Sequence, residues 1–294
     1  MRLLVTGATG FLGWRTATLL AGRGHDVLCL IRPGAADRAA ARALTLAAVR
    51  VDAGDPAARD LIAGRDAVLH FAGMPDPARA RADPAAAVRA NAGTTLNLLE
   101  GCLRHHAALV YPSSVRAAQV PQPDPYAASK RLGEEACRGH AARATVVRLT
   151  SVFGPGQVRA EGATGAIAAF AARALAGAPI VIPGDPARTR DFLYVDDLVD
   201  GLERLVAEGP WSATVLAGSG VDTPLAEAAE AVRRAAGSEL PVELPGGALP
   251  AGEDASYPMA PRAQRLALTP RPLPAAIAAY VDWLRPHPAA EGRA

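Results

Sequence analysis

The feature that most constrains the fold is a glycine-rich turn directly after the first apolar run. The run covers Arg2 to Thr6, the turn reads T6-G-A-T-G-F-L-G13, and a helical pattern continues through Leu20. Side chains at the three glycine positions would block both a tight turn and the close approach of a phosphate to the backbone. The helix N-terminus that follows offers free N–H groups and a partial positive charge. The sequence therefore predicts a strand–turn–helix unit that binds a pyrophosphate, with a purely structural tight turn as the alternative.

The first half of the chain alternates short apolar runs with longer helical patterns. Further strands are predicted at Asp26–Ile31, Thr45–Val51, Ala67–Phe71, Ala107–Tyr111 and Thr145–Leu149, with helices between them that include Ala80–Arg104 and Tyr126–Ala141. Alternation of this kind implies a parallel sheet with helices on both faces. The predicted fold class is α/β, a doubly wound parallel sheet of the Rossmann type, formed by a dinucleotide-binding domain over residues 1–150.

The second half of the chain has a different pattern, because proline and glycine become frequent and the apolar runs become short. Residues 151–188 and 209–294 are predicted to form a smaller C-terminal α/β lobe that binds substrate. A strand at Arg190–Tyr194 and a helix at Val195–Ala207 are predicted to return to the first sheet. Two more helices are expected at Thr223–Ala236 and Pro274–Leu284.

Charge and cysteine content exclude several classes of protein. The net charge is +2 and the basic residues are scattered, which gives no argument for nucleic acid or membrane binding. No stretch of about 18 apolar residues exists, so no membrane span is expected. The three cysteines are far apart, show no metal-ligand spacing and suggest a reducing compartment. We expect a cytoplasmic protein without a bound metal.

Lys130 is the only lysine in the chain, and it lies four residues after Tyr126 in Y126-A-A-S-K130. On a helix these two positions share one face. A tyrosine is a poor base at neutral pH, and a nearby ammonium lowers its pKa. Arginine is not equivalent, because its charge is spread over a wider planar group. The spacing predicts a tyrosine–lysine pair in one cleft, and a surface tyrosine with a solvated lysine is the alternative.

The glycine turn and Y-A-A-S-K together resemble the extended short-chain dehydrogenase/reductases, the NAD-dependent epimerase/dehydratase family. Further matching segments follow in order along the chain: D66-A-V-L-H-F-A-G73, N91-A-G-T-T-L-N-L-L-E100, S151-V-F-G-P-G156 and R190-D-F-L-Y-V-D-D197. The resemblance implies hydride transfer between NADP or NAD and a secondary alcohol or ketone carbon, most specifically of a nucleotide-linked sugar. It also implies a homodimer formed through the helices at 80–104 and 126–141.

The resemblance assigns roles to residues of this sequence. Ser114, Tyr126 and Lys130 would be catalytic, with Ser114 bonding the substrate oxygen and helping to pass a proton to or from Tyr126. The implied cofactor-binding residues are Gly7, Thr9, Gly10, Phe11, Leu12, Gly13, Arg32, Asp52, Ala53, Phe71, Ala72, Gly73, Asn91, Ser113, Tyr126 and Lys130. The implied substrate-binding residues are Ser114, Ser151, Arg190 and Arg262, with a structural salt bridge as the alternative for the two arginines. His70 is expected to pack at a strand end rather than act as a base.

Three departures from the family pattern narrow the function. Dehydratases of the group carry an Asp-Glu pair where this chain has Val115 and Arg116, which disfavours water elimination. Members that prefer NAD end the second strand with an acidic residue, whereas Ile31 and Arg32 stand here, and an arginine pairs with a 2′-phosphate. This favours NADP slightly over NAD. Sugar-nucleotide epimerases usually have Asn at the position of Ser151.

The sequence leaves epimerase and ketoreductase open. A reductase of a non-sugar ketone or aldehyde is a second hypothesis. A non-catalytic dinucleotide-binding sensor or scaffold is a third, although such proteins usually lose the tyrosine or the lysine.

Overall fold

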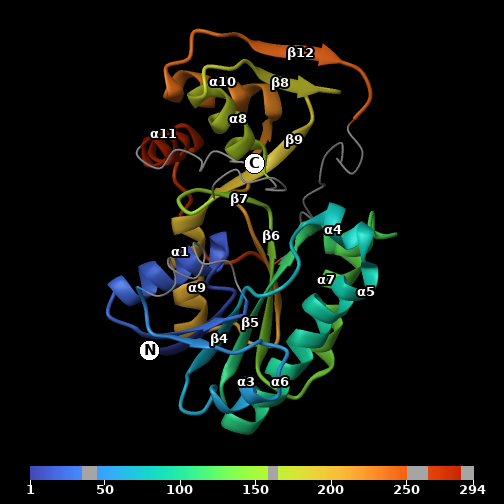
Figure 1. The fold of residues 1–294 in the computed structure, drawn as a ribbon, viewed down its shortest axis with the longest axis vertical. Helices are drawn as coiled ribbons and strands as arrows, with labels where there is room; N and C mark the ends of the chain where they lie inside the picture. Colours follow the sequence, from blue (N-terminus) through green and yellow to red (C-terminus); the bar gives the residue numbers. More distant parts are fainter. Residues whose placement is uncertain (35–44, 158–164, 250–263, 286–294) are drawn as a thin grey trace. The chain divides into compact units, whose positions relative to one another are not determined.

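The computed structural model describes residues 1–34, 45–157, 165–249 and 264–285 (Figure 1). The described chain divides into two compact units. Unit 1 contains residues 1–149, 199–217 and 264–267, and unit 2 contains residues 150–198, 218–249 and 268–285. The chain leaves unit 1 after Leu149 and returns to it inside helix α9 (Val195–Glu208).

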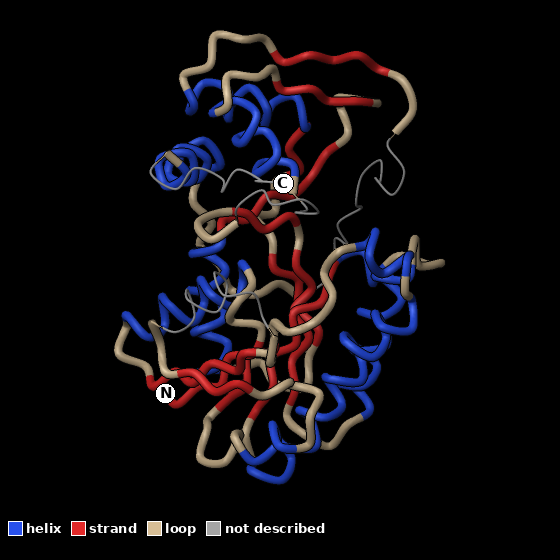
Figure 2. The backbone as a smooth tube through the Cα atoms, in the orientation of Figure 1, coloured by secondary structure: helices blue, strands red, loops and turns tan. Residues whose placement is uncertain are grey.

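Unit 1 is built on a parallel sheet, which in the described part of the chain has seven strands in the order β10-β6-β5-β4-β1-β2-β3 (Figure 2). The strands are β1 (Arg2–Thr6), β2 (Asp26–Ile31), β3 (Ala48–Arg50), β4 (Ala67–His70), β5 (Ala108–Ser114), β6 (Ala144–Leu149) and β10 (Thr214–Ala217). Every neighbouring pair is parallel. Their near-continuous apolar composition fits this arrangement, because parallel sheets are covered on both faces. The predicted doubly wound α/β fold is confirmed.

Helices cover both faces of this sheet. Helices α1 (Phe11–Gly22) and α9 lie on one face, and α6 (Thr94–His105) and α7 (Pro125–Gly139) on the other (Figure 1). On the first face Arg23 pairs with Asp200 of α9 at 2.5 Å. On the second face α7 approaches β5 closely, because a Cβ added to Gly133 would lie 2.2 Å from the Tyr111 hydroxyl. The close approach fixes where the side chains of α7 meet the ends of the strands.

The helix predicted over Ala80–Arg104 is wrong as one element. The structure has α4 (Pro77–Ala82), α5 (Pro84–Val88), a π-helical turn η1 (Arg89–Gly93) and then α6. Each short helix starts with proline after an aspartate cap: Asp76 accepts from the Ala78 N–H and Asp83 from the Ala86 N–H, both at 2.8 Å. Proline at N1 starts a helix well but cannot continue the one before it. The aspartate–proline pairs therefore divide the segment.

The strand predicted at Arg190–Tyr194 exists as β9 (Thr189–Tyr194), but it does not join the first sheet. It pairs with β7 (Ser151–Phe153) and β11 (Asp222–Pro224) in a separate sheet, which has three strands in the described part of the chain. The strand that returns to the first sheet is β10, which is parallel to β6. β10 was missed because its four residues, T-V-L-A, are too short for a periodic signal. The helix predicted at Val195–Ala207 corresponds to α9.

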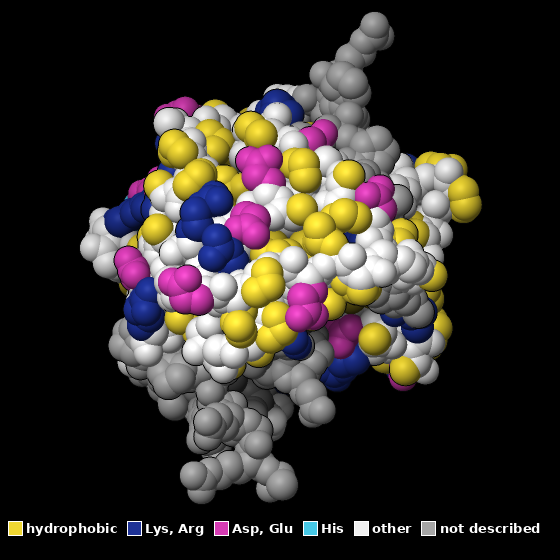
Figure 3. Space-filling model, turned by 90° about the horizontal axis from the view of Figure 1, so that it is seen from above, with side chains coloured by type: hydrophobic (Ala, Val, Ile, Leu, Met, Phe, Trp, Pro, Cys, Tyr) yellow, Lys and Arg dark blue, Asp and Glu magenta, His cyan; other side chains and the backbone are white. Residues whose placement is uncertain are grey.

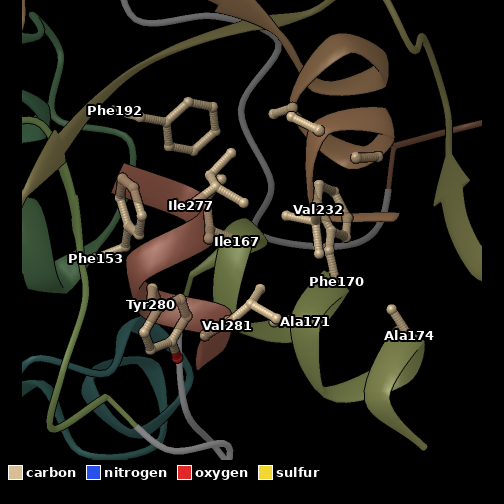
Figure 4. Packing of buried hydrophobic residues seen from close by; sticks show 14 of the residues in the cluster. Phe153, Ile167, Phe170, Ala171, Ala174, Phe192, Val232, Ile277, Tyr280 and Val281 are labelled. Carbon is tan, nitrogen blue, oxygen red and sulfur yellow. The ribbon is translucent and has the colours of Figure 1, made fainter. Parts of the chain in front are cut away.

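Unit 2 has its own apolar core (Figure 4). Its remaining elements are α8 (Ala166–Leu175), β8 (Ile180–Pro183), α10 (Leu225–Ala236), β12 (Val242–Gly246) and α11 (Leu273–Leu284). Phe153 is the centre of an aromatic cluster, with ring centroids 5.7 Å from Tyr194, 6.0 Å from Tyr280 and 6.3 Å from Phe192. Helices α10 and α11 correspond to the two predicted over 223–236 and 274–284.

The surface shown in Figure 3 mixes basic, acidic and apolar side chains, so neither sign of charge dominates that face. Among the described residues, no helix combines the length and the apolar composition that crossing a membrane requires.

Candidate active site

The predicted glycine turn connects β1 to α1, and two of its glycines are required by close contacts. Gly7 has φ +69°, and a Cβ there would lie 2.5 Å from the backbone carbon of Phe71. A Cβ on Gly13 would lie 2.3 Å from the Gly7 carbonyl oxygen. The Gly10 N–H donates to that same carbonyl at 2.9 Å. Phe11, Leu12 and Gly13 form the first turn of α1, whose free N–H groups lie at the edge where the strands end.

The ends of β1 and β4 are joined by side chains as well as by the ladder. The Thr6 hydroxyl lies 2.8 Å from Nδ1 of His70 and accepts from the Ala72 N–H at 3.0 Å. Burial, with the charge of Lys130, lowers the pKa of His70 to about 3, so the ring is neutral. His70 therefore packs at a strand end, as predicted, and holds the backbone against which Gly7 lies.

Next to this turn is a cavity of about 850 Å³ formed within unit 1. Of the predicted cofactor-binding residues, the cavity wall includes Gly7, Thr9, Gly10, Arg32, Asp52, Ala53, Phe71, Ala72 and Gly73. The others are not part of its wall: Phe11, Leu12, Gly13, Asn91, Ser113, Tyr126 and Lys130. The wall also includes residues that the sequence did not single out, namely Leu30, Val51, Gly54, Asp55, Pro75, Ala86, Arg89, Ala90, Gly93 and Thr94. The predicted residues of the wall follow β1, β2, β3 and β4, and these strands all end at one edge of the sheet.

Asn91 lies at the centre of the π turn η1 and is buried. Its Oδ1 accepts from the Met74 N–H at 2.9 Å, and its Nδ2 donates to the Met74 carbonyl at 3.1 Å and to the Ser129 hydroxyl at 2.8 Å. A Cβ on Gly73 would lie 2.3 Å from Oδ1. Asn91 thus joins the loop after β4 to helix α7. Its side chain supports the site from behind rather than forming the wall of the cavity.

Asn97 has a similar supporting role, and the sequence analysis did not identify it. Its Nδ2 donates to the carbonyls of Ala53 and Asp55, both at 2.9 Å, and its Oδ1 accepts from Arg59 Nε at 2.7 Å. Ala53 and Asp55 form part of the cavity wall. The available signal was an amide side chain next to the buried leucines of α6, since buried polar groups need hydrogen-bond partners.

Strand β5 ends in two serines whose side chains point to opposite faces of the sheet, as alternation requires. Ser113 is buried, and its hydroxyl donates to Glu134 Oε1 at 2.7 Å. The Ser114 hydroxyl forms a hydrogen bond with Tyr126 and accepts from the Arg116 N–H at 3.2 Å. The structure therefore brings Ser114 and Tyr126 together, as predicted, whereas Ser113 bonds to a carboxylate of α7.

Tyr126 lies in the first turn of α7, which Asp124 caps by accepting from the Ala127 N–H at 2.8 Å. Burial raises the pKa of Tyr126, Asp124 raises it further, and the hydrogen bond to Ser114 and the charge of Arg116 lower it. The sequence predicted a lowered pKa, and the prediction is wrong because burial outweighs the opposing groups. At neutral pH Tyr126 is therefore a neutral phenol.

Lys130 is buried one helical turn further along α7. Its Nζ donates to the Pro112 carbonyl at 2.9 Å and lies 4.9 Å from the centroid of the Tyr111 ring. Burial lowers the pKa of Lys130 to about 8, against the charges of Cys137 and Glu134, which raise it. The ammonium form therefore predominates at neutral pH. It is held at the end of β5, next to the backbone of the two serines.

Glu134 lies at the centre of an ion cluster on the Ser113 face. Arg148 on β6 donates to both of its oxygens, at 2.8 and 2.6 Å, and Arg138 donates to Oε2 at 2.8 Å. Arg131 is 3.6 Å away, and the carboxylate is fully buried. Despite burial, the bonds from Arg148 and Ser113 lower the pKa of Glu134, so the carboxylate is ionised.

Two of the predicted substrate residues, Ser151 and Arg190, lie in unit 2, and Ser114 lies in unit 1. Ser151 begins β7, and Arg190 on β9 is buried and donates from Nη1 to the Thr189 carbonyl at 2.8 Å. The neighbouring Asp191 accepts from the N–H and hydroxyl of Ser219 and from the Gly220 N–H, at 2.7 to 2.8 Å. Arg262 lies outside the described residues.

A search against protein families matches residues 3–215 to the NAD dependent epimerase/dehydratase family. Among curated proteins, the chain is 28% identical to a dTDP-glucose 4,6-dehydratase of Streptomyces griseus, over 81% of this chain and 79% of that protein. It is 29% identical to a UDP-glucose 4-epimerase of Mycolicibacterium smegmatis, over 81% and 83%. It is 27% identical to a dTDP-4-dehydro-6-deoxy-D-allose reductase of Streptomyces bikiniensis, over 97% and 96%.

Solved structures show the same fold. The UDP-glucose 4-epimerase of Thermus thermophilus in complex with NAD is 25% identical, with a TM-score of 0.79 over 97% of this chain and 99% of that chain.

Proposed function

This chain belongs to the NAD-dependent epimerase/dehydratase family, and we propose that it transfers hydride at a secondary alcohol or ketone carbon of a nucleotide-linked sugar, as an epimerase or a ketoreductase. The observation that carries the proposal is the hydrogen-bonded pair of Ser114 and Tyr126 at the end of β5. The pair lies at the same edge of the sheet as the glycine turn and the cavity. Epimerases, dehydratases and reductases of nucleotide-linked sugars are among its relatives.

The residues present fit a nicotinamide dinucleotide. Gly7 and Gly13 leave space that any Cβ would fill, and the N-terminus of α1 offers N–H groups to a diphosphate. We assign Thr9, Gly10, Asp52, Ala53, Phe71 and Gly73 to the walls of this site, with Asn91 and Ser113 as supports. The bound cofactor supplies hydride exchange at its nicotinamide ring.

The proton that accompanies hydride transfer is donated or accepted by side chains of this chain. Ser114 bonds the substrate oxygen, and Tyr126 donates a proton to it when a ketone is reduced and accepts one when an alcohol is oxidised. The neutral state of Tyr126 at neutral pH favours donation. Lys130 provides a positive charge at the end of β5 that favours the phenolate while the proton is away. Ser151 and Arg190 of unit 2, with Arg262, are our candidates for holding the substrate.

Water elimination does not fit the residues around Ser114. Val115 and Arg116 offer no carboxylate there, and Asp124 is already bonded to Arg116 and to the Ala127 N–H. We therefore assign the chain to the epimerases or ketoreductases of the family.

For the cofactor we propose NADP, with Arg32 as the ligand of the 2′-phosphate. Arg32 follows β2, is exposed and forms part of the cavity wall. No ion pair to it occurs among the described residues. Calorimetric titration of nucleotide-free protein with NADPH and NADH tests this. Tighter binding of NADPH that Arg32→Ala abolishes, with binding of NADH retained, supports the assignment. Exclusive binding of NADH overturns it and favours the epimerase.

The reaction is tested with nucleotide sugars, starting with UDP-glucose and a dTDP-4-dehydro-6-deoxy sugar, with products separated by chromatography. An epimerase interconverts two sugars without net consumption of cofactor, and a ketoreductase consumes NAD(P)H stoichiometrically. Turnover of simple ketones or aldehydes alone indicates the non-sugar reductase. Binding of cofactor without any turnover indicates a sensor or scaffold.

We also propose a homodimer formed through α5, α6 and α7. These helices carry four large apolar side chains that are 39 to 47% exposed, namely Val88, Leu96, Leu103 and Leu132. Apolar side chains gathered on neighbouring helices are typical of interfaces between copies. Sedimentation at micromolar concentration tests this: a dimer that Leu103→Glu converts to a monomer supports it, and a wild-type monomer contradicts it. The three thiols are free, in keeping with our proposal of a cytoplasmic protein.

A further inference from the structure

We propose that Arg116 is a positioning residue for Tyr126: its guanidinium favours the phenolate, and Asp124 limits how strongly it does so. The inference rests on the proposed function, in which Tyr126 moves the proton. It concerns residues to which the proposed reaction gives no role.

The backbone places Arg116 next to the reacting hydroxyls. Arg116 belongs to the short 3₁₀ turn η2 (Val115–Ala118), which begins directly after Ser114. The Ser114 hydroxyl oxygen accepts from the Arg116 N–H at 3.2 Å and is also hydrogen-bonded to Tyr126. One oxygen atom therefore connects the two residues.

The side chain of Arg116 is held by Asp124. Nη2 of Arg116 bonds to Oδ2 of Asp124, and the two side chains are only 11% and 3% exposed. The other oxygen of Asp124 accepts from the Ala127 N–H and caps α7, in whose first turn Tyr126 lies. The ion pair is thus attached at one end to the Ser114 loop and at the other to the helix that carries Tyr126.

The two members of the Arg116–Asp124 ion pair shift the pKa of Tyr126 in opposite directions. Burial raises the pKa of Tyr126 and Asp124 adds to that, whereas Arg116 opposes it. Among the described residues, Tyr111 on β5 also interacts with Tyr126, and Lys130 lies one turn further along α7. Arg81 on α4 is 3.8 Å from Asp124 and 41% exposed. Removing either member of the buried pair should therefore move the titration of Tyr126, and in opposite directions.

The test reads the ionisation of Tyr126 directly. A fluorotyrosine placed at position 126 is more acidic than tyrosine and gives a fluorine NMR signal that follows its titration without substrate. Arg116→Gln is expected to lower the phenolate-to-phenol ratio at a fixed pH by about tenfold. Arg116→Lys keeps the charge and restores the ratio. Asp124→Asn raises the ratio, and α7 stays capped because asparagine is also a good N-cap.

The matched control is Arg81→Gln, which removes an exposed charge that also approaches Asp124. It should leave the titration unchanged. Any of three results overturns the proposal. The first is an equal shift in Arg81→Gln and Arg116→Gln. The others are shifts of the same sign in Arg116→Gln and Asp124→Asn, or no shift in either of these two variants. If the shifts occur as expected and no nucleotide sugar is turned over, the proposed function fails while the coupling of Arg116 to Tyr126 stands. If turnover occurs, its pH profile should shift in the same direction as the fluorine signal.

Discussion

At the end of β5, the two faces of the sheet differ in how fully a buried ionisable group is compensated by its neighbours. On the Ser113 face, the buried carboxylate of Glu134 is bonded by Arg148, Arg138 and the serine hydroxyl. On the Ser114 face, a neutral phenol has one cation and one anion beside it. A buried charge that is fully compensated has a proton state fixed far from neutral pH. A group that is only partly compensated can gain or lose its proton during a reaction. We infer that the first face supports the structure and the second performs the chemistry.

Tyr126→Phe makes the strongest test of this difference. Loss of the phenol should lower kcat/KM by about 10² to 10⁴-fold, the usual contribution of a general acid or base. Stability should fall by only about 1 kcal/mol, because one hydrogen bond to Ser114 is lost. Steady-state kinetics and urea unfolding measure the two effects. A large loss of stability with little loss of rate would reverse the roles of the two faces.

Glu134→Gln tests the other face. Breaking a buried ion cluster by removing one partner typically costs about 3 to 5 kcal/mol of unfolding free energy. The pKa of Glu134 is lowered in the folded protein, so its contribution is present above the model-compound pKa of 4.5 and is lost as the pH falls through the folded-state pKa. Urea unfolding should therefore show the full deficit at pH 7 and a smaller one in acid. An unchanged deficit at all pH values contradicts the assignment.

Ser113→Ala separates the hydroxyl from the ion cluster. Glu134 keeps its bonds to Arg148 and Arg138, so we expect a loss of about 1.5 kcal/mol, the value for a hydrogen bond to a charged group. The expected effect on kcat is small once the protein is folded. A loss of activity as large as that of Tyr126→Phe would place Ser113 on the reacting side.

Glu135→Gln is the matched control for Glu134→Gln. Glu135 is the next residue on α7 and pairs with the same Arg131 and Arg138, both at 2.8 Å, but its side chain is 51% exposed. Exposed pairs contribute about 0 to 1 kcal/mol, so unfolding in urea should change by about 0.5 kcal/mol or less. A deficit close to that of Glu134→Gln would show that burial does not set the difference between the two faces.

The sequence predicted most of unit 1, because its strands are buried on both faces and read as apolar runs next to a recognisable glycine turn. The break of the long helix at Asp83–Pro84 was readable from the sequence but was missed. The π turn could not be predicted, because it depends on bonds from Asn91 to Met74 and Ser129. Strand β9 was also placed in the wrong sheet, because pairing partners such as Ser151 and Asp222 are distant in sequence. Short strands in unit 2 carry too few residues to indicate their partners.

The candidate catalytic residues could be found from residue type and spacing, but their protonation states could not be predicted from the sequence. Helical spacing brought Tyr126 and Lys130 onto one helix face, yet burial and Arg116 decide the state of the phenol. The resemblance gave Ser113 and Ser114 different roles, but it did not reveal Glu134 as the partner of Ser113, which depends on the packing of α7 against β5. Asn97 was missed because its partners, two backbone carbonyls and Arg59, lie about 40 residues away in the sequence and belong to no motif.

The π turn at Arg89–Gly93 confines one extra residue to a single turn of the helix. Such a turn holds one more residue than an α-helical turn, so the helix on either side of it keeps its orientation. Deleting Ala90 or Ala92 would therefore leave a regular α-helix in which Asn97 still faces the Ala53 and Asp55 carbonyls. The residue that would move is Asn91, whose bonds to Met74 and Ser129 join the loop after β4 to α7. The extra residue thus affects the support behind the cavity and not the orientation of α6.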